Sequence, residues 1–317
     1  PYGKDVLKML SDACRKEGIK LFFYYSQLDW YRDDYFPRGR TGNGISGRGE
    51  GDWNDYIKFM KAQLTELLTN YGEIGGIWFD GQWDQHEWDG KRFGKLKADF
   101  KLTEVYELIH KLQPQALIGS NHHLSPNPGE DFQMFEKDLP GKGTKNFATS
   151  ADDIGNLPLE VCETINGSWG FNLKDRKHKS EKELVQYLVK AAGYGSNLLL
   201  NVGPMPNGKI QDEHIESLKK IGKWVKQNGQ TIYNTKRGPI SPSDEIASTQ
   251  DGNIVYIHLL DNNKSEYFIE GFKSKFKNIS YLDSNKKVSY KKTKTGLHLI
   301  LDKKEINSID TILIMEL

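Results

Sequence analysis

A carboxylate at the end of a short apolar run is the first candidate for chemistry in this sequence. Residues 75–79 read Gly-Gly-Ile-Trp-Phe, too short for a helix and rich in strand formers, and Asp80 and Gly81 follow directly. We interpret the run as a buried strand whose C-terminal end presents Asp80. In a chain of alternating strands and helices, a parallel barrel places its catalytic groups at that end. An Asp-Gly pair also caps ordinary turns, so the motif alone leaves both interpretations open.

Other predicted strand ends and their loops carry further polar side chains. These are Tyr24, Asn121, His122, His123, Glu130, Glu136, Glu160 and Glu163, with Trp78, Trp83, Trp88 and Trp169 close to them in sequence. No glycine-rich phosphate loop follows a predicted strand, and no Gly-x-Ser-x-Gly elbow is present. Carboxylates combined with tryptophans then favour glycoside hydrolysis.

A metal centre has little support in the sequence. Adjacent side chains such as His122 and His123 diverge on an extended segment, and neither HExxH nor CxxC occurs. We therefore expect no metal and no cofactor, and we expect each histidine to be structural or to make hydrogen bonds.

Composition excludes several classes of partner. The chain has 317 residues, enough for two domains, and is 37% hydrophobic and 27% charged, as ordinary globular proteins are. Its 44 basic and 43 acidic residues nearly cancel, so neither nucleic acid nor an anionic membrane is an expected partner. No apolar stretch is long enough to span a membrane. We interpret Cys14 and Cys162 as two buried free thiols.

Strands and helices alternate as far as Gly229. Helical periodicity is found over residues 4–17, 57–71 and 105–112, after the capping-box pair Ser180 and Glu183, and in a segment that ends at Gly229. Strand-like runs cover residues 19–26, 75–80, 116–119, 132–136, 159–162 and 197–202. This rhythm predicts an α/β fold with parallel strands, either a doubly wound sheet or a (β/α) barrel, and the missing phosphate loop counts against the first. The long loop Gln27–Gly51 is expected to be functional.

The pattern changes near Thr235. Short runs with partial alternation follow, separated by Asp-Asn, Asp-Gly and Lys-rich turns. They cover residues 254–260, 267–269, 287–290, 297–301 and 311–315. We predict a small all-β sandwich over residues 235–317, after a barrel-like domain over residues 1–234. Its lysines are read as a solvated face, and a carbohydrate-binding role for the domain stays open.

Several motifs in order resemble the retaining α-L-fucosidases of glycoside hydrolase family 29. They are Tyr24-Tyr25-Ser26-x-Leu28-Asp29-Trp30, Trp78-Phe79-Asp80-Gly81, Pro158-Leu159-Glu160-x-Cys162-x-Thr164, Ser168-Trp169-Gly170-Phe171, and residues 197–204 with Gly208. The likeness runs from residue 1 to about Tyr233, and the C-terminal β domain matches in position and type. The resemblance implies a (β/α)-barrel-like catalytic domain, incomplete in this chain, followed by a β-sandwich.

The resemblance also implies roles for individual residues. Asp80 would attack the anomeric carbon of fucose and form a covalent glycosyl-enzyme intermediate. Glu136 lies in a segment similar to the one that carries the acid/base, with Glu130 as second choice. Glu160 and Glu163 come third. The acid/base should have a raised pKa, so that it is protonated at the start of the reaction.

Substrate contacts are implied from Tyr24, Trp78, His122, His123, Glu130 and Trp169. The two tryptophans would line the apolar face of fucose, although either residue could equally pack inside the barrel. His122 stands where many family members have an arginine.

The substrate implied is a fucosylated oligosaccharide or glycoconjugate, and the implied location is extracytoplasmic: periplasmic, secreted or lysosomal. Alternatives are another retaining barrel glycosidase, such as an α-galactosidase, or a fucose-binding protein that has lost catalysis. Family members carry early barrel strands before the stretch that begins at Pro1. We therefore expect this chain to be a fragment, or its N-terminal barrel part to lie on another chain or to have been left out of the sequence. We therefore expect this chain alone to be inactive and unstable, because an open parallel sheet exposes an edge.

Overall fold

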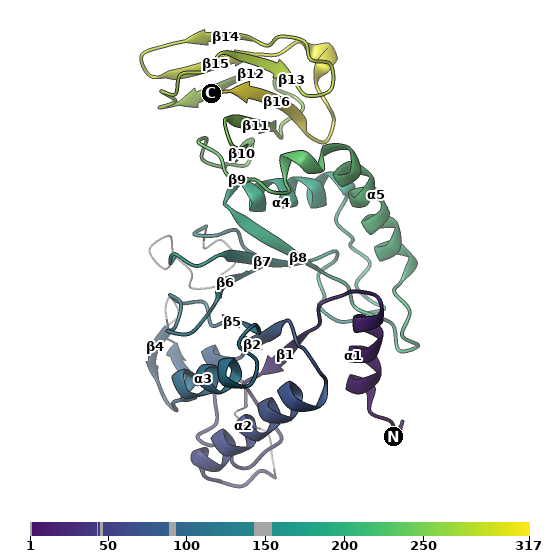
Figure 1. Ribbon diagram of the computed structural model, residues 1–317, viewed down its shortest axis with the longest axis vertical. Coiled ribbons are helices and arrows are strands. Elements are labelled where there is room, and N and C mark those ends of the chain that lie inside the picture. The colour runs from purple at the N-terminus through teal and green to yellow at the C-terminus, as the bar shows by residue number, and fades with distance from the viewer. Residues whose placement is uncertain (1, 43, 45–46, 89–92, 143–153) are drawn as a thin grey trace. The chain divides into compact units, whose positions relative to one another are not determined.

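The computed structural model of the protein describes residues 2–42, 44, 47–88, 93–142 and 154–317 (Figure 1). The chain forms two compact units. The first unit consists of Pro1–Glu136 and Gly141–Leu159, and the second of Lys137–Pro140 and Glu160–Leu317. The predicted domain boundary between residues 234 and 235 falls inside the second unit and stays a prediction.

The first unit is built on parallel strands that alternate with helices. Strand β1 pairs with β2, β2 with β5, and β5 with β6, each pair in parallel. In chain order the elements are α1 (Val6–Lys16), β1 (Phe22–Ser26), α2 (Trp53–Asn70), β2 (Gly76–Asp80), the 3-10 helix η1 (Gln82–Gln85), β3 (His86–Trp88), β4 (Phe93–Leu96), α3 (Leu102–Leu112), β5 (Leu117–Asn121) and β6 (Phe132–Glu136). The strand–helix alternation predicted from hydrophobic periodicity is confirmed.

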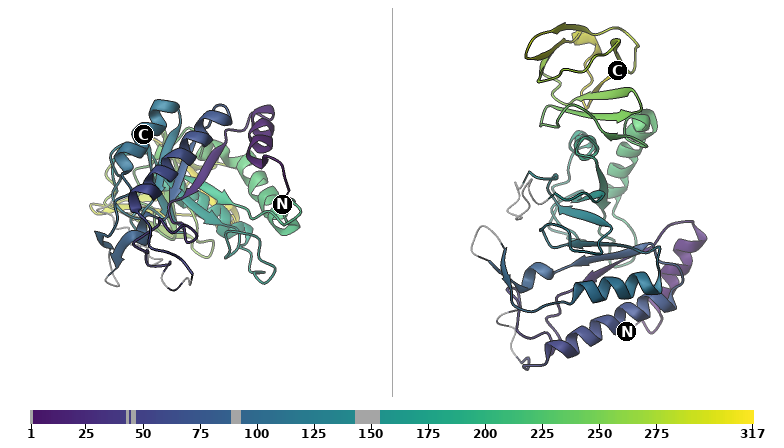
Figure 2. Two further views of the ribbon diagram at one scale, coloured as in Figure 1. Left: turned by 90° about the horizontal axis from the view of Figure 1, so that it is seen from below. Right: turned by 60° about the vertical axis from the view of Figure 1, so that its left-hand side comes forward.

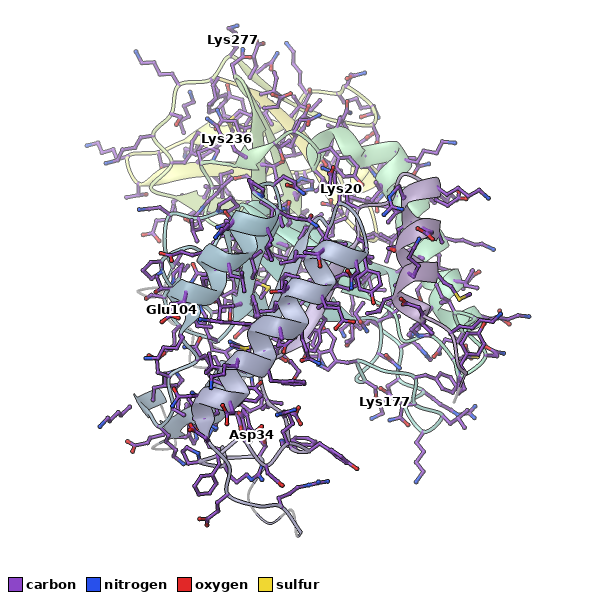
Figure 3. The ribbon with its side chains drawn as sticks, turned by 60° about the horizontal axis from the view of Figure 1, so that its bottom comes forward. Lys20, Asp34, Glu104, Lys177, Lys236 and Lys277 are labelled. Carbon is purple, nitrogen blue, oxygen red and sulfur yellow. The ribbon has the colours of Figure 1, made fainter. Side chains whose placement is uncertain are left out.

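Helices α2 and α3 lie side by side along this sheet (Figure 2). Lys61 of α2 forms an ion pair of 2.6 Å with Glu104 of α3, which Figure 3 labels. The two helices and alternate strand residues share one core, which includes Phe23, Met60, Leu64, Ile77, Phe79, Val105, Ile109 and Ile118. Each fully buried side chain of this kind contributes about 1.5–3 kcal/mol, so this core fixes the strand register on which the site depends.

The second unit joins further strand–helix steps to antiparallel sheets. Its elements are β7 (Leu159–Thr164), α4 (Glu181–Gly193), β8 (Ser196–Asn201), α5 (Asp212–Asn228), η3 (Gly229–Thr231), β9 (Lys236–Arg237), β10 (Ile246–Asp251), β11 (Ile254–Leu259), β12 (Glu266–Glu270), β13 (Asn278–Tyr281), β14 (Ser289–Lys292), β15 (Gly296–Ile300), η4 (Lys303–Glu305) and β16 (Thr311–Glu316). One sheet has the order β13-β16-β11-β10-β9 and the other β12-β15-β14. The capping box of Ser180 and Glu183 at the start of α4 is confirmed.

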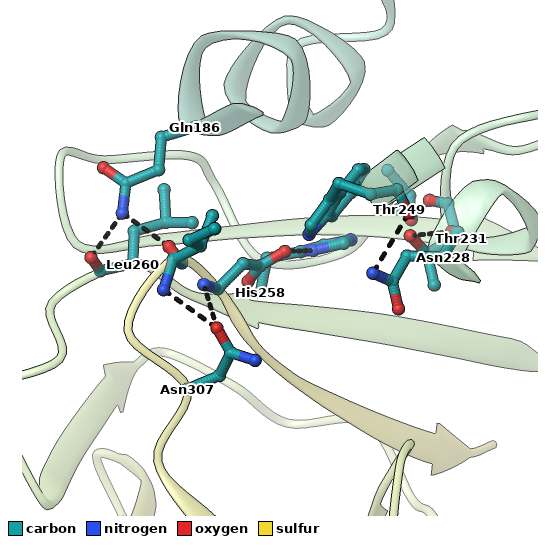
Figure 4. Close-up of polar contacts among 10 residues, drawn as sticks. Gln186, Asn228, Thr231, Thr249, His258, Leu260 and Asn307 are labelled. Carbon is teal, nitrogen blue, oxygen red and sulfur yellow. Dashed lines mark hydrogen bonds and ion pairs between the residues drawn. The ribbon is translucent and has the colours of Figure 1, made fainter. Parts of the chain in front are cut away.

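Polar contacts fix the sandwich to α4 and to the end of α5 (Figure 4). The Gln186 amide of α4 donates to the carbonyls of Leu260 (2.6 Å) and Ile309 (2.8 Å). The Thr249 hydroxyl of β10 donates to the carbonyl of Thr231 (2.5 Å). An apolar cluster fills the space between these contacts, with Val185, Val189, Trp224, Ala247, Leu260 and Ile312 buried in it.

Some expectations need correction. The strand predicted as buried over residues 19–26 is the edge strand β1, so Phe22 and Tyr24 are exposed although Phe23 and Tyr25 are buried. Cys162 is a buried free thiol as predicted, but Cys14 is only half-buried because α1 leaves much of its surface to solvent. Strands β3, β4, β9, β10 and β13 were not predicted, since their runs are short and polar.

Candidate active site

Strand register places three predicted site residues of the first unit, Tyr24, Trp78 and Asp80, on one face of its sheet. Tyr24, Trp78 and Gly119 are register partners across β1, β2 and β5. Two residues further along, Ser26, Asp80 and Asn121 form the next row. Side chains two apart on a strand point to the same face. Tyr24, Trp78, Asp80 and Asn121 therefore share the face opposite the buried core.

The Asp80 carboxylate, which is half-buried, accepts three hydrogen bonds. The Tyr24 hydroxyl donates to Oδ2 at 2.7 Å. Nε1 of Trp83 donates to Oδ1 at 3.0 Å, and Nδ2 of Asn121 donates to the same oxygen at 3.3 Å. Gly81 has φ +104°, and a Cβ there would lie 2.9 Å from Leu28, so this turn after Asp80 requires glycine. Three donors hold the carboxylate in one orientation and stabilise negative charge on it.

Glu136, at the end of β6, meets Asp80 through one shared donor. Nδ2 of Asn121 donates to Oε2 of Glu136 at 2.9 Å, in addition to its bond to Asp80. The two oxygens that share this nitrogen are therefore at most about 6 Å apart, and about 5 Å if each accepts a different amide hydrogen. Retaining glycosidases keep their two carboxyl groups about 5–5.5 Å apart, and inverting ones about 6.5–9.5 Å. A single amide thus brings one oxygen of Asp80 and one oxygen of Glu136 to within about 6 Å of each other.

Tyr24 combines an aromatic face with a donor. Its ring stacks on Trp78, with centroids 5.6 Å apart and planes inclined by 25°. Desolvation and the neighbouring Asp80 carboxylate raise the pKa of Tyr24, so the phenol keeps its proton and donates it to Oδ2. Sugar contact by Tyr24 and Trp78 stays a prediction.

His123 is a buried, neutral histidine beside the acid pair. Burial, followed by the charges of His122 and Arg40, lowers the pKa of His123 to about 3. Its Nε2 lies 3.9 Å from Oε2 of Glu136. Because the ring is neutral at ordinary pH, this contact is not an ion pair. The predicted role of His123 in substrate binding stays a prediction.

His122 and Glu130 form a separate, enclosed cluster. Nδ1 of His122 accepts from the backbone N–H of Leu124, so Nε2 carries the proton and donates to Glu130 Oε1 at 3.0 Å. Tyr106 of α3 and Asn127 each donate to the same carboxylate at 3.1 Å. The side chains of His122 and Glu130 are 2% and 0% exposed. This burial argues against direct contact of either residue with a substrate, and against Glu130 as the acid/base. As predicted, the adjacent histidines diverge.

The remaining predicted residues belong to the second unit. Glu163 is buried, accepts from the backbone N–H of Thr164 at 2.7 Å and pairs with Lys179 at 3.3 Å. Glu160 is half-buried on β7. Trp169 is partly exposed, its carbonyl accepts from Asn201, and Nζ of Lys137 lies 4.6 Å from the centre of its ring. The roles predicted for Glu160, Glu163 and Trp169 stay predictions. The Glu163 carboxylate is bound by Lys179 and by the Thr164 backbone, as expected of a structural residue.

Two residues that contact Asp80 were not selected from the sequence as site residues. Trp83 was noted only as a nearby tryptophan, and Asn121 only as a strand end. Their position relative to Asp80 gives the signal: Trp83 is three residues later in a tight turn, and Asn121 ends the neighbouring strand in register. Within the ranges that the structure describes, no group of three or more His, Cys, Asp or Glu side chains is arranged to hold a metal ion.

Comparison with known proteins agrees with the motifs. The sequence profile of the family described as Alpha-L-fucosidase matches residues 1–230. The alpha-L-fucosidase of Dictyostelium discoideum is 25% identical over 240 residues, which cover 74% of this chain and 46% of that protein. The chain spans about half the length of the curated relatives it matches.

Solved structures share the fold. Alpha-L-fucosidase isoenzyme 1 from Paenibacillus thiaminolyticus is 30% identical with a TM-score of 0.76, over 100% of this chain and 76% of its own. An alpha-fucosidase of Thermotoga maritima, at 24% identity, has a TM-score of 0.71 over 99% of this chain and 68% of its own. These similarities confirm the predicted fold class, a barrel-like α/β domain followed by a β-sandwich.

Proposed function

This chain belongs to the α-L-fucosidase family, and from that membership we propose that it hydrolyses terminal α-L-fucosyl linkages with retention of configuration. Asp80 is the nucleophile and Glu136 the acid/base. The observation that carries the proposal is the Asn121 amide, which donates to both carboxyl groups and so holds one oxygen of each within about 6 Å of the other. An inverting enzyme needs a wider gap, since a water molecule must fit between the sugar and the base.

The first step is a displacement at the anomeric carbon. A carboxylate oxygen of Asp80 forms a bond to this carbon while the bond to the leaving oxygen breaks. Glu136 gives its proton to that oxygen, so the aglycone departs as a neutral alcohol. Tyr24, Trp83 and Asn121 keep the Asp80 carboxylate oriented for attack.

The second step reverses these roles. Water attacks the anomeric carbon of the fucosyl-enzyme, Glu136 accepts a proton from that water, and the bond to Asp80 breaks. Fucose is released with its original configuration and Asp80 is again a carboxylate. The neutral His123 beside Glu136 adds no positive charge of its own as the acid cycles between its two forms.

Among the described residues, no helix is both long and apolar enough to cross a membrane. Family membership supports a fucosylated oligosaccharide or glycoconjugate as substrate and a working place outside the cytoplasm. Hydrolysis of aryl α-L-fucoside and aryl α-D-galactoside by the same preparation tests the sugar, because L-fucose is 6-deoxy-L-galactose and therefore differs from D-galactose in absolute configuration and at C6. Faster hydrolysis of the galactoside would overturn the assignment.

Trapping tests the nucleophile. A 2-fluoro-fucosyl reagent with a good leaving group should label the protein, and the labelled peptide should contain Asp80. Asp80→Ala should take no label and should lose activity by about 10⁴-fold or more, because both steps pass through this side chain. A label on another peptide, or β-fucose as the first product seen by NMR, would refute the mechanism.

A further inference from the structure

A buried carboxylate four residues after Asp80 holds residues 35–41 of the long loop against the turn that follows β2. The Asp84 side chain is fully buried. Its Oδ1 accepts from the backbone N–H (2.8 Å) and the hydroxyl (2.6 Å) of Thr41, and its Oδ2 accepts from the hydroxyl of Tyr35 (3.0 Å). The Asp84 carbonyl also accepts from the backbone N–H of Arg40 at 2.9 Å. All these donors belong to the loop, part of which lies around Asp34 in Figure 3.

Glycine at position 39 allows the loop to come this close. A Cβ at Gly39 would lie 1.6 Å from Oδ2 of Asp84, where no side chain fits. The Gln85 amide adds a bond of 2.9 Å to the carbonyl of Pro37. The carboxylate and the loop backbone are therefore fitted to one another.

The contacts of the Asp84 carboxylate with Tyr35 and Thr41 are called the clamp below. Arg40 connects this clamp to Trp83. Its guanidinium carbon lies 5.4 Å from the ring centre of Trp83 and 5.7 Å from that of Trp88. Its Nε donates to the Trp83 carbonyl at 3.2 Å. The Trp83 indole in turn donates to Oδ1 of Asp80 at 3.0 Å. Contacts thus run from the Asp84 backbone carbonyl through Arg40 and Trp83 to the carboxylate of Asp80, and the Asp84 carboxylate holds Thr41, the residue next to Arg40.

We propose that Asp84 is a positioning residue for the nucleophile, acting through Arg40 and Trp83. By fixing the loop, Asp84 holds the Trp83 indole where its N–H meets Asp80. This inference rests on the proposed function, since it gives Asp84 a part in a reaction that Asp80 carries out. Hydrogen bonds weaken steeply with angle and distance, and a misplacement of about 1 Å is enough to slow an enzyme greatly.

The kinetic test uses substitutions in the full chain. Asp84→Ala should lower kcat on an aryl fucoside about tenfold with little change in KM, since it disturbs the nucleophile and not the bound sugar. Thr41→Val removes one hydroxyl donor at an exposed position and should lower kcat about threefold. It keeps the test valid if Asp84→Ala fails to fold. Asp33→Ala is the matched control, because Asp33 lies in the same loop but binds the backbone of Gly49.

A double-mutant cycle with Trp83→Phe separates positioning from general loosening. If Asp84 acts through the Trp83 indole, Asp84→Ala should cost less than about twofold in the Trp83→Phe background. An equal cost in both backgrounds would overturn the proposal, as would an equal loss in Asp33→Ala.

A measurement without substrate distinguishes this proposal from the function. In protein labelled with ¹⁵N-tryptophan, the Trp83 indole signal is identified by its loss in Trp83→Phe. It should shift in Asp84→Ala and Thr41→Val and stay in place in Asp33→Ala. If the wild-type protein, assayed with the early barrel strands present, cleaves no fucoside, the proposed function fails, and the indole shift still tests the clamp. An unmoved indole signal in Asp84→Ala would overturn the clamp.

Discussion

Two carboxylate clusters of the first unit start from adjacent residues, Asn121 at the end of β5 and His122 directly after it. Both have three donors: Tyr24, Trp83 and Asn121 for Asp80, and Tyr106, His122 and Asn127 for Glu130. They differ in access. Asp80 is half-buried and the Glu136 side chain is 18% exposed, whereas the Glu130 side chain is 0% exposed.

The comparison teaches that the number of hydrogen-bond donors does not distinguish Asp80, the proposed nucleophile, from Glu130, a carboxylate that only stabilises the fold. A buried carboxylate with all its partners costs energy to disturb and offers nothing to a ligand. The same number of donors around the half-buried Asp80 carboxylate instead orients it for the attack that we propose. Adjacent residues of an extended segment point to opposite sides, so one segment serves both purposes.

Among the substitutions compared here, Glu136→Gln should give the largest effect on catalysis. Without a proton donor, kcat/KM for a fucoside with a poor leaving group should fall about 10³-fold, within the range of general acid catalysis. With a leaving group that needs no proton, the loss in the first step should be much smaller. Steady-state rates over a series of aryl fucosides measure this difference. Equal losses across the series would remove Glu136 from the role of acid.

Glu130→Gln, in the enclosed cluster, should lower the free energy of unfolding and leave the catalytic rate almost unchanged. The glutamine amide places an NH₂ group where the Glu130 carboxylate had an oxygen that accepted a hydrogen bond. Two donors then face each other, and a buried polar group is left without an acceptor. We expect a loss of about 3 kcal/mol in the free energy of unfolding, with kcat per folded molecule within about threefold of wild type. Urea unfolding and active-site titration provide the two numbers. A loss of kcat comparable to that of Glu136→Gln, at unchanged stability, would place Glu130 in the chemistry instead.

Much of this site could be predicted from the sequence because local patterns mark strand ends. The run before Asp80 and the Asp-Gly pair predicted the strand and its carboxylate, and the structure places both as expected. Glu136 was chosen by resemblance, and it meets Asp80 through Asn121. Burial was harder to predict. The exposure of Tyr24 on the edge strand depends on which strands lie beside it, which local periodicity does not encode.

The difference in burial between Glu130 and Glu136 could not be predicted from the sequence either. Both are glutamates close to the same strand, and six residues separate them. Glu130 is enclosed because Tyr106, 24 residues earlier on α3, packs over it. A contact over that separation depends on the docking of α3 on the sheet, which no local motif reports.

Asn121→Ala should have a moderate effect, because it removes the donor shared by Asp80 and Glu136. The two carboxyl groups would lose their common orientation, and kcat/KM should fall about 30-fold, close to 2 kcal/mol. Asn127→Ala is the matched control, since it removes a donor of the same type from Glu130 and should leave kcat within about twofold. If both substitutions lower kcat alike, the shared amide is not what aligns the pair.

His123→Asn should give the smallest effect, one that depends on pH. Burial lowers the pKa of His123 to about 3, below the value of about 6.5 for an exposed histidine. Between these values the unfolded chain binds a proton that the folded chain does not, so the free energy of unfolding falls as pH falls below about 6.5. From pH 7 to 5.5 this side chain should account for about 1 kcal/mol of the loss.

Asparagine tolerates the positive φ of 63° at this position, so the variant should fold. Urea unfolding should show a shallower decline with acid in the variant, and the difference at pH 8 serves as internal control because the histidine is neutral there in both states. Identical slopes below pH 6.5 would show that His123 gains its proton in the folded protein, and the neutral neighbour assigned to Glu136 would then be a cation.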